Sequence, residues 1–204
     1  MIGIINYGMG NIKSVENALA HINQPSFIVQ KKEDFRKATK LILPGVGAFS
    51  LAMQNLEKIG FDDMIKESCL ENGKPLLGIC LGMQLLLSSS EEFGYNNGLN
   101  LIQGRVLNFK TVLTDLRVPH VGWNNVKRKK NSLISENMDN RDYYFVHSFY
   151  CHLEDNNQVS GTTSYGIDFH SSLEHKNIYG CQFHPEKSQE AVLEIFKNYC
   201  KLEF

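Results

Sequence analysis

Long apolar stretches are missing from this chain of 204 residues, in which no hydrophobic run approaches the ~18 residues that a membrane-spanning helix needs. The first residues have neither the basic start nor the cleavable apolar segment of a secretory signal. An excess of one charge is also missing, since 21 lysines and arginines oppose 22 aspartates and glutamates. A net charge of -1 gives no electrostatic reason to expect a nucleic acid as partner. We therefore expect a cytoplasmic protein that binds neither membranes nor nucleic acids.

Paired cysteines are missing as well. The five cysteines are an odd number at scattered spacings, and they include no C-x-x-C pair. This pattern argues against a disulfide framework and a thiolate zinc site, and it favours free thiols in a reducing compartment. No dinucleotide fingerprint is present either, because Gly8-Met9-Gly10 and Gly45-Val46-Gly47 have Lys13 and Ser50, respectively, where a third glycine would stand. We expect neither a metal nor a cofactor.

The chain does contain enough apolar material for one sizeable core, with 42% hydrophobic residues. Short apolar runs at residues 2–6, 27–29, 40–43 and 76–79 are typical of buried strands. Helical patterns at residues 12–22, 49–59 and 61–71 alternate with them, and a further helix is expected after residue 80, including residues 83–88. This alternation predicts a single α/β domain over residues 1–204, with a doubly wound, mostly parallel open sheet flanked by helices.

The C-terminal half has a different sequence pattern. Short β-like runs at residues 104–109, 143–147, 158–163 and 178–183 predict additional short strands there. A final helix is expected near the C-terminus, because Val192, Ile195, Phe196 and Tyr199 fall on one helical face.

Cys80 stands at the predicted junction of a strand and a helix, within Gly78-Ile79-Cys80-Leu81-Gly82. Two glycines leave room for a tight turn, and the pattern is the thiol version of the G-x-S-x-G nucleophile elbow. At a helix N-terminus the dipole favours thiolate over thiol, and the free amide of Leu81 can donate to an oxyanion. The alternative is a small buried hydrophobic cysteine, which is how we interpret the other four.

A thiolate nucleophile needs a base, and the base needs a group that orients it. His184-Pro185-Glu186 offers both, at the end of the strand expected over residues 178–183. Pro185 pushes His184 toward extended geometry, so residues 184 and 186 would point to the same side with Cα atoms about 7 Å apart. The alternative is a surface turn with an incidental histidine.

A glycine loop, Pro44-Gly45-Val46-Gly47, follows the strand expected over residues 40–43. It can point backbone amides at the end of a neighbouring strand and so supply a second oxyanion donor. The alternative is a simple turn.

These segments belong to a wider pattern of six: Asn6-Tyr7-Gly8-Met9-Gly10-Asn11, Leu43-Pro44-Gly45-Val46-Gly47, Gly78-Ile79-Cys80-Leu81-Gly82-Met83-Gln84, Pro119-His120-Val121-Gly122-Trp123-Asn124, Tyr144-Phe145-Val146-His147-Ser148 and Gln182-Phe183-His184-Pro185-Glu186-Lys187-Ser188. Together they resemble the class I (triad) glutamine amidotransferases, and most closely the glutaminase subunits of imidazole glycerol phosphate synthase. The resemblance covers essentially the whole chain. One departure is Asn6, where most members would have Asp.

The resemblance implies a flavodoxin-like fold and a thiol glutaminase. Cys80 would attack the side-chain amide of L-glutamine, His184 would move the protons, and Glu186 would hold the imidazole. Leu81 and the loop at Val46 and Gly47 would supply the oxyanion donors. The amino-acid end of the substrate would be held by Gln84, Glu92 and the backbone around His147, Ser148 and Phe149. By motif alone, Gln84 and Glu92 would be ordinary helix-surface residues.

The released ammonia needs an acceptor, and the resemblance implies a separate (β/α)8-barrel cyclase subunit that forms a heterodimer for histidine biosynthesis. His120, Trp123 and Asn124 are candidates for the docking face, because a Trp beside a His and an Asn suits an interface. The alternative for Trp123 is a core position. Tyr144 and Lys187 would lie near the ammonia exit. The basic run Lys127-Arg128-Lys129-Lys130 is expected in a solvated loop.

Three other functions remain open from the sequence. A similar glutaminase subunit could feed a sugar amidotransferase in surface polysaccharide synthesis. A cysteine hydrolase acting alone, such as a γ-glutamyl hydrolase, would need no partner. A non-catalytic scaffold would keep the fold without the chemistry.

Overall fold

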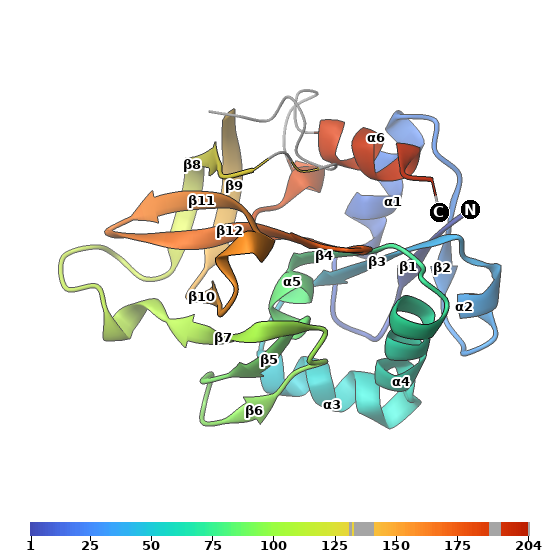
Figure 1. Ribbon diagram of the computed structural model, residues 1–204, viewed down its shortest axis with the longest axis horizontal. Coiled ribbons are helices and arrows are strands. Elements are labelled where there is room, and N and C mark those ends of the chain that lie inside the picture. The colour runs from blue at the N-terminus through green and yellow to red at the C-terminus, as the bar shows by residue number, and fades with distance from the viewer. Residues whose placement is uncertain (131, 133–140, 188–192, 204) are drawn as a thin grey trace.

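The parallel half of the sheet forms the centre of the computed structural model, which describes residues 1–130, 132, 141–187 and 193–203. Five neighbouring strands run parallel in the order β2, β1, β3, β4, β13 (Figure 1). Their bounds are Ser26–Val29, Ile2–Ile5, Lys40–Gly45, Leu76–Cys80 and Ile178–Cys181.

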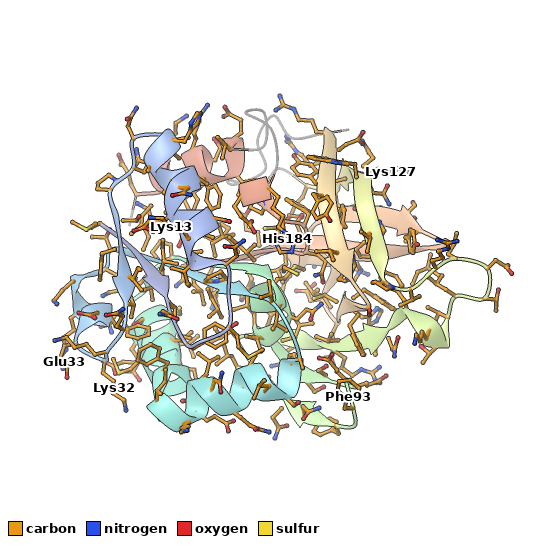
Figure 2. The ribbon with its side chains drawn as sticks, turned by 180° about the vertical axis from the view of Figure 1, so that it is seen from behind. Lys13, Lys32, Glu33, Phe93, Lys127 and His184 are labelled. Atoms are coloured by element: carbon orange, nitrogen blue, oxygen red, sulfur yellow. The ribbon has the colours of Figure 1, made fainter. Side chains whose placement is uncertain are left out.

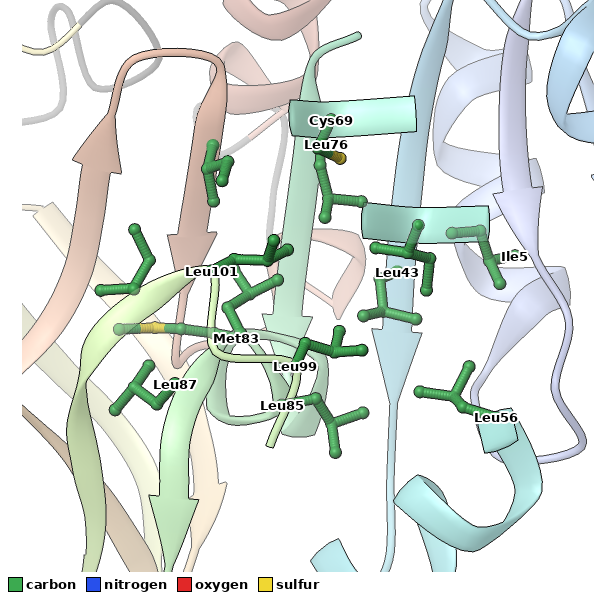
Figure 3. Close-up of a cluster of buried hydrophobic side chains, with 14 of the residues drawn as sticks. Ile5, Leu43, Leu56, Cys69, Leu76, Met83, Leu85, Leu87, Leu99 and Leu101 are labelled. Carbon is green, nitrogen blue, oxygen red and sulfur yellow. The ribbon is translucent and has the colours of Figure 1, made fainter. Parts of the chain in front are cut away.

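Alternate residues of these strands enter two different hydrophobic clusters, one on each face of the sheet. Ile5 and Leu43 belong to one cluster, which Figure 3 shows with Leu76 and Leu56, while Ile4 and Ile42 belong to the other. A strand that is buried on both faces carries apolar residues at every position. This is why the parallel strands are continuous hydrophobic runs in the sequence.

Helices cover both faces (Figure 1). The first cluster contains apolar residues of α3 (Phe49–Ile59) and α4 (Phe61–Lys66), and the second contains residues of α1 (Ile12–His21) and α6 (Glu194–Lys201). Gly60 ends α3 with φ 68, a left-handed conformation that glycine adopts without strain. Other helices in the part of the chain that the structure describes are α2 (Asp34–Lys37), the π-helix η1 (Glu67–Glu71) and α5 (Leu81–Leu85).

The rest of the sheet begins at β13, which pairs with β12, and continues through β10, β7, β5 and β6; these pairs are antiparallel except for β5 with β7, which are parallel. Strands β11, β8 and β9 branch from β12 as a ribbon. The bounds are β5 Leu87–Ser90, β6 Asn96–Asn97, β7 Ile102–Asn108, β8 His120–Arg128, β9 Arg141–His147, β10 Phe149–Leu153, β11 Val159–Tyr165 and β12 Ile167–His175. Short 3-10 turns are η2 Phe109–Thr111, η3 Asn156–Gln158 and η4 Pro185–Lys187.

The predicted fold class, with a mostly parallel sheet and extra strands, is confirmed. The helix expected to include residues 83–88 is wrong in its second half, because α5 ends at Leu85 and Leu87–Ser90 form a strand beside β7. The basic run is not wholly a loop, since Lys127 and Arg128 pair with β11. Val192 and Ser188 lie outside the described residues. None of the helices within the described ranges has the length and hydrophobicity of a membrane span.

Candidate active site

A sharp turn places Cys80 between the end of β4 and the start of α5. Cys80 has φ 54 and ψ -112, a conformation that is rare outside glycine and is held by tight packing around the turn. A Cβ on Gly82 would lie 1.8 Å from the backbone oxygen of Leu43, and one on Gly78 would lie 2.7 Å from the oxygen of Gly82. Glycine at both positions therefore lets α5 pack directly against β3 and β4.

His184 and Glu186 form a close buried pair at the end of β13. His184 Nδ1 lies 2.7 Å from Glu186 Oε1, and each side chain is 2% exposed. The expected extended spacing between residues 184 and 186 is wrong, because Pro185–Lys187 form a 3-10 turn. The fixed φ of Pro185 suits that turn as well as an extended segment, and the turn brings the carboxylate back onto the ring. The His184 backbone N–H donates to the Tyr144 carbonyl over 2.9 Å, which anchors this segment to β9.

His184 also faces the elbow, because it lines the same pocket as Cys80. Burial lowers the pKa of His184, but its interactions with Cys80 and Glu186 outweigh that effect and raise the pKa to about 10. The ring is therefore an imidazolium at neutral pH. Figure 2 shows His184 near the centre of the molecule.

A pocket of about 600 Å³ opens above this group. Its wall includes ten of the residues singled out in the sequence: Val46, Gly47, Cys80, Leu81, Gln84, Glu92, His147, Ser148, Phe149 and His184. Five more residues line it: Pro119 and Val146 lie within the quoted motifs but had no role assigned, and Phe93, Asn108 and Lys110 had no signal in the sequence. Segments far apart in the chain thus converge on one cavity large enough for an amino acid.

The glycine loop after β3 packs against the elbow. A Cβ on Gly45 would lie 2.6 Å from the Tyr7 hydroxyl and 2.9 Å from the Leu81 Cβ, so this position accepts only glycine. Gly47 has φ +103, and Val46 beside it is 43% exposed at the rim of the pocket. Residues of this loop and of α5 therefore line the same cavity.

Gln84 and Glu92 are not helix-surface residues, contrary to what their motifs alone predict. Gln84 is buried on α5, and its Nε2 donates to the Phe149 carbonyl over 3.1 Å and to Gln182 Oε1 over 3.0 Å. Glu92 follows β5 in a turn, where its Oε2 accepts from the Phe49 backbone N–H at 2.6 Å. The carboxylate is therefore held at the N-terminus of α3 and lines the pocket.

Gln182 is a site residue that lies in a quoted motif but had no role assigned from the sequence. It is fully buried, and its Nε2 donates to Cys80 Sγ over 3.7 Å. The available signal was a polar residue at the end of an apolar strand, two positions before His184.

The residues expected on the docking face divide into two groups. Trp123 is 53% exposed, its ring lies 5.9 Å from that of Tyr144, and Lys187 Nζ lies 5.2 Å from the centre of the Tyr144 ring. The core alternative for Trp123 is therefore wrong. His120 and Asn124 instead point inward, because His120 is 3% exposed and Asn124 Nδ2 lies 3.2 Å from His120 Nε2.

The fold and the site define an α/β protein whose reactive thiol sits at a strand–helix elbow, beside an imidazole and a carboxylate. Within the described residues, no group of three or more His, Cys, Asp or Glu side chains could hold a metal ion. Residues 3–200 match the family model for glutamine amidotransferase class-I. The chain belongs to the class I glutamine amidotransferase family, and it is an enzyme of that kind.

Several named relatives are similar over nearly their full length. The imidazole glycerol phosphate synthase subunit HisH of Sulfurimonas denitrificans is 47% identical over 204 residues, which cover 98% of each chain. Subunit HisH 2 of Methanococcus maripaludis is 44% identical, over 98% of this chain and 99% of that protein. A crystal structure of a glutamine amidotransferase superposes with a TM-score of 0.76 at 17% identity, covering 98% of both chains, which supports the fold.

Proposed function

We propose that this chain is the glutaminase subunit of an imidazole glycerol phosphate synthase, which hydrolyses L-glutamine and passes the ammonia to a separate subunit. The observation that carries the proposal is that Cys80 lines one pocket with His184, whose ring contacts Glu186 at 2.7 Å. The names of the relatives support the choice of synthase.

In the proposed reaction, the Cys80 thiolate attacks the side-chain carbonyl carbon of glutamine. The His184 imidazolium gives its proton to the departing nitrogen, so ammonia leaves and a glutamyl thioester forms. A water molecule then attacks the thioester as His184 takes its proton, which releases glutamate and restores the thiolate. The raised pKa of His184 suits the first step, because the ring holds its proton at neutral pH.

Fixed dipoles would stabilise the negative oxygen of each tetrahedral intermediate. Leu81, Val46 and Gly47 line the pocket together with Cys80, and their backbone amides are the proposed donors. A donor of this kind contributes on the order of 3 kcal/mol. Glu186 would keep the ring oriented and stabilise its positive charge through the 2.7 Å contact.

Recognition of the amino-acid end would come from the opposite wall. Glu92 offers a carboxylate to the α-ammonium group, while Gln84 and the backbone of His147, Ser148 and Phe149 surround the remaining polar atoms. Metals and cofactors have no part in this scheme.

The proposed partner is a (β/α)8-barrel cyclase that binds the face formed by Trp123, Tyr144 and Lys187. Trp123 is exposed and packs against the partly buried Tyr144 ring, and aromatic residues are enriched at interface centres. The proposed location is the cytoplasm, where the five free cysteines would stay reduced.

Covalent labelling by a diazo-ketone analogue of glutamine, followed by mass spectrometry, tests the proposal. We expect one adduct per chain on Cys80, and no adduct after Cys80→Ser. Cys200→Ser is the matched control, because Cys200 is only partly buried and lies outside the pocket, and it should label like the unmodified chain. Absence of labelling at Cys80 would overturn the glutaminase assignment.

Transfer of the amide nitrogen tests the choice of partner. Glutamine labelled at its amide nitrogen should deliver the label into imidazole glycerol phosphate when the barrel cyclase is present. Delivery only to a sugar amidotransferase would replace this partner with the other acceptor. Full glutaminase activity without any partner and without transfer would indicate a hydrolase that acts alone.

A further inference from the structure

Gln182 contacts the sulfur that the proposed reaction uses as its nucleophile. Its side chain is fully buried, and its Nε2 donates to Cys80 Sγ over 3.7 Å, within the range of a hydrogen bond to sulfur. Its Oε1 accepts from Gln84 Nε2 over 3.0 Å. Gln182 therefore joins α5 to the elbow cysteine through one amide group.

The orientation of this amide follows from a backbone carbonyl. The Phe149 carbonyl oxygen can only accept, so the atom of Gln84 that lies 3.1 Å from it must be the amide nitrogen. The second N–H of that nitrogen then points at Gln182, so the Gln182 oxygen must face Gln84. The Gln182 nitrogen is left to face the sulfur, and a flipped amide would lose both contacts.

The other groups near the sulfur do not supply negative charge at neutral pH. Tyr7, Cys151 and Cys181 all interact with Cys80, and burial raises the pKa of each of these groups far above neutrality. His184 lines the same pocket, and its interactions with Cys80 and Glu186 outweigh burial and raise its pKa to about 10, so the ring carries a positive charge. The sulfur thus lies between a cationic ring, an amide donor and neutral groups.

We propose that Gln182 is a further catalytic residue, whose amide N–H donates to the Cys80 thiolate and holds the sulfur in its attacking position. The proposal rests on the proposed function, in which that thiolate is the nucleophile. A hydrogen bond to a charged acceptor stabilises the thiolate more than it reduces nucleophilicity, because the dependence of thiol reactivity on basicity has a slope of only about 0.4–0.5.

The test is the rate at which Cys80 is alkylated by iodoacetamide at about pH 6, where an unperturbed thiol is almost fully protonated. This reagent is small and needs no glutamine site. Gln182→Met keeps the length of the side chain but removes the donor, and we expect the rate to fall about tenfold. Gln54→Met, on the exposed face of α3, is the matched control and should react like the unmodified chain.

The direction in which the alkylation rate of Cys80 changes distinguishes the proposed role of Gln182 from a purely structural role. A loss of packing would expose the buried thiol and raise the alkylation rate, whereas a loss of the donor lowers it. Gln182→Glu keeps the shape, replaces the donor by a carboxylate and should lower the rate at least as far. An unchanged or raised rate in Gln182→Met, with a folded chain by circular dichroism, would overturn the proposal.

The proposed function can fail separately. If the glutamine analogue does not label the unmodified chain at Cys80, the glutaminase assignment is wrong whatever the alkylation rates are. If the analogue labels Cys80 but Gln182→Met is alkylated at the unmodified rate, only the role of Gln182 is wrong.

Discussion

His120 Nδ1 lies 3.0 Å from His147 Nε2, so two buried rings from adjacent strands share one hydrogen bond. His147 Nδ1 faces the Phe149 carbonyl at 2.7 Å and must carry the proton there, because a carbonyl oxygen can only accept. The bare His147 Nε2 then accepts from His120, and His120 Nε2 accepts from Asn124 Nδ2 over 3.2 Å. All three hydrogen bonds thus have the same donor-to-acceptor direction, from Asn124 on β8 to the Phe149 carbonyl at the pocket.

Asn124→Asp should disturb the pocket from a distance, because aspartate offers no donor to His120. His120 would have to turn its proton toward the new carboxylate, His147 would have to follow, and a bare Nδ1 would then face the Phe149 carbonyl. Leaving a buried group unsatisfied costs about 1–3 kcal/mol, so we expect labelling of Cys80 by the glutamine analogue to slow about tenfold.

Asn125→Asp is the control for this prediction. The next residue of the strand points to the opposite side, and its charge change is the same. Equal labelling rates for the unmodified chain and Asn124→Asp would show that the direction of the hydrogen bonds does not matter to the pocket.

The buried histidines also predict a loss of stability in acid. Burial lowers the pKa of His120 to about 4 and that of His147 to about 3. An unfolded histidine has a pKa of about 6.5, so below that pH the unfolded chain binds more protons and the free energy of unfolding falls as the pH drops. We expect a decrease of at most about 3 kcal/mol per histidine, measured by urea unfolding from about pH 7 to about pH 4.

Two variants check the origin of this acid dependence. His120→Gln should weaken the dependence of the free energy of unfolding on pH. His21→Gln, at the exposed end of α1, should leave that dependence unchanged. His184 acts in the opposite sense, because its raised pKa makes its contribution disappear as the pH rises from about 6.5 toward about 10. A free energy of unfolding that is constant across the acid range would contradict the neutral histidine pair.

The parallel half of the fold could be predicted because burial on both faces leaves a strong signal. Leu76, Leu77 and Ile79 are all buried, so β4 is a continuous apolar run ending at a glycine-framed cysteine. β8 gives no such signal, because most of its own residues are partly or fully exposed, and its pairing with β9 depends on segments that are distant in the sequence.

The site likewise contains some features that depend on short segments and others that depend on contacts between segments far apart in the sequence. The Cys80 elbow and the His184–Glu186 pair depend on short segments, and both could be expected from the sequence. The environment of Glu92 depends on the N-terminus of α3, and that of Gln182 depends on a glutamine of another element. Contacts between distant segments leave no periodicity to detect.

Gly82→Ala should strongly destabilise the fold. The added Cβ would lie 1.8 Å from the backbone oxygen of Leu43, which cannot move without disrupting β3. We expect a loss of at least about 3 kcal/mol in the free energy of unfolding, measured with urea. Gly73→Ala is the control, since nothing lies within 4 Å of its Cβ and only its φ of +65 costs about 1 kcal/mol. Similar losses in the two variants would mean that close packing at the elbow is not what requires Gly82.

Glu186→Gln should reduce glutamine hydrolysis roughly a hundredfold, because the ring loses its anionic partner at 2.7 Å. The pKa of His184 should fall as well, since the hydrogen bond and the charge of Glu186 both raise it. The pH–rate profile of kcat should therefore lose activity at a lower pH on its alkaline side. Glu194→Gln, in the first turn of α6, is the control and should keep the unmodified profile. A profile that stays in place would show that Glu186 does not set the charge of the ring.

Trp123→Ala should weaken binding of the barrel subunit more than any comparable change elsewhere on the surface. Trp123 is 53% exposed and stands edge-on to the Tyr144 ring, so a partner can cover both rings at once. Truncation of such an aromatic centre costs at least about 2 kcal/mol, which is about a thirtyfold rise in Kd, measured by calorimetry. Tyr95→Ala is the control, because Tyr95 is 75% exposed but lies beside β6, away from the β8–β9 ribbon, and its loss should leave Kd unchanged. An unchanged Kd for Trp123→Ala would move the docking face elsewhere, while a loss of binding in both variants would point to a general effect on the surface.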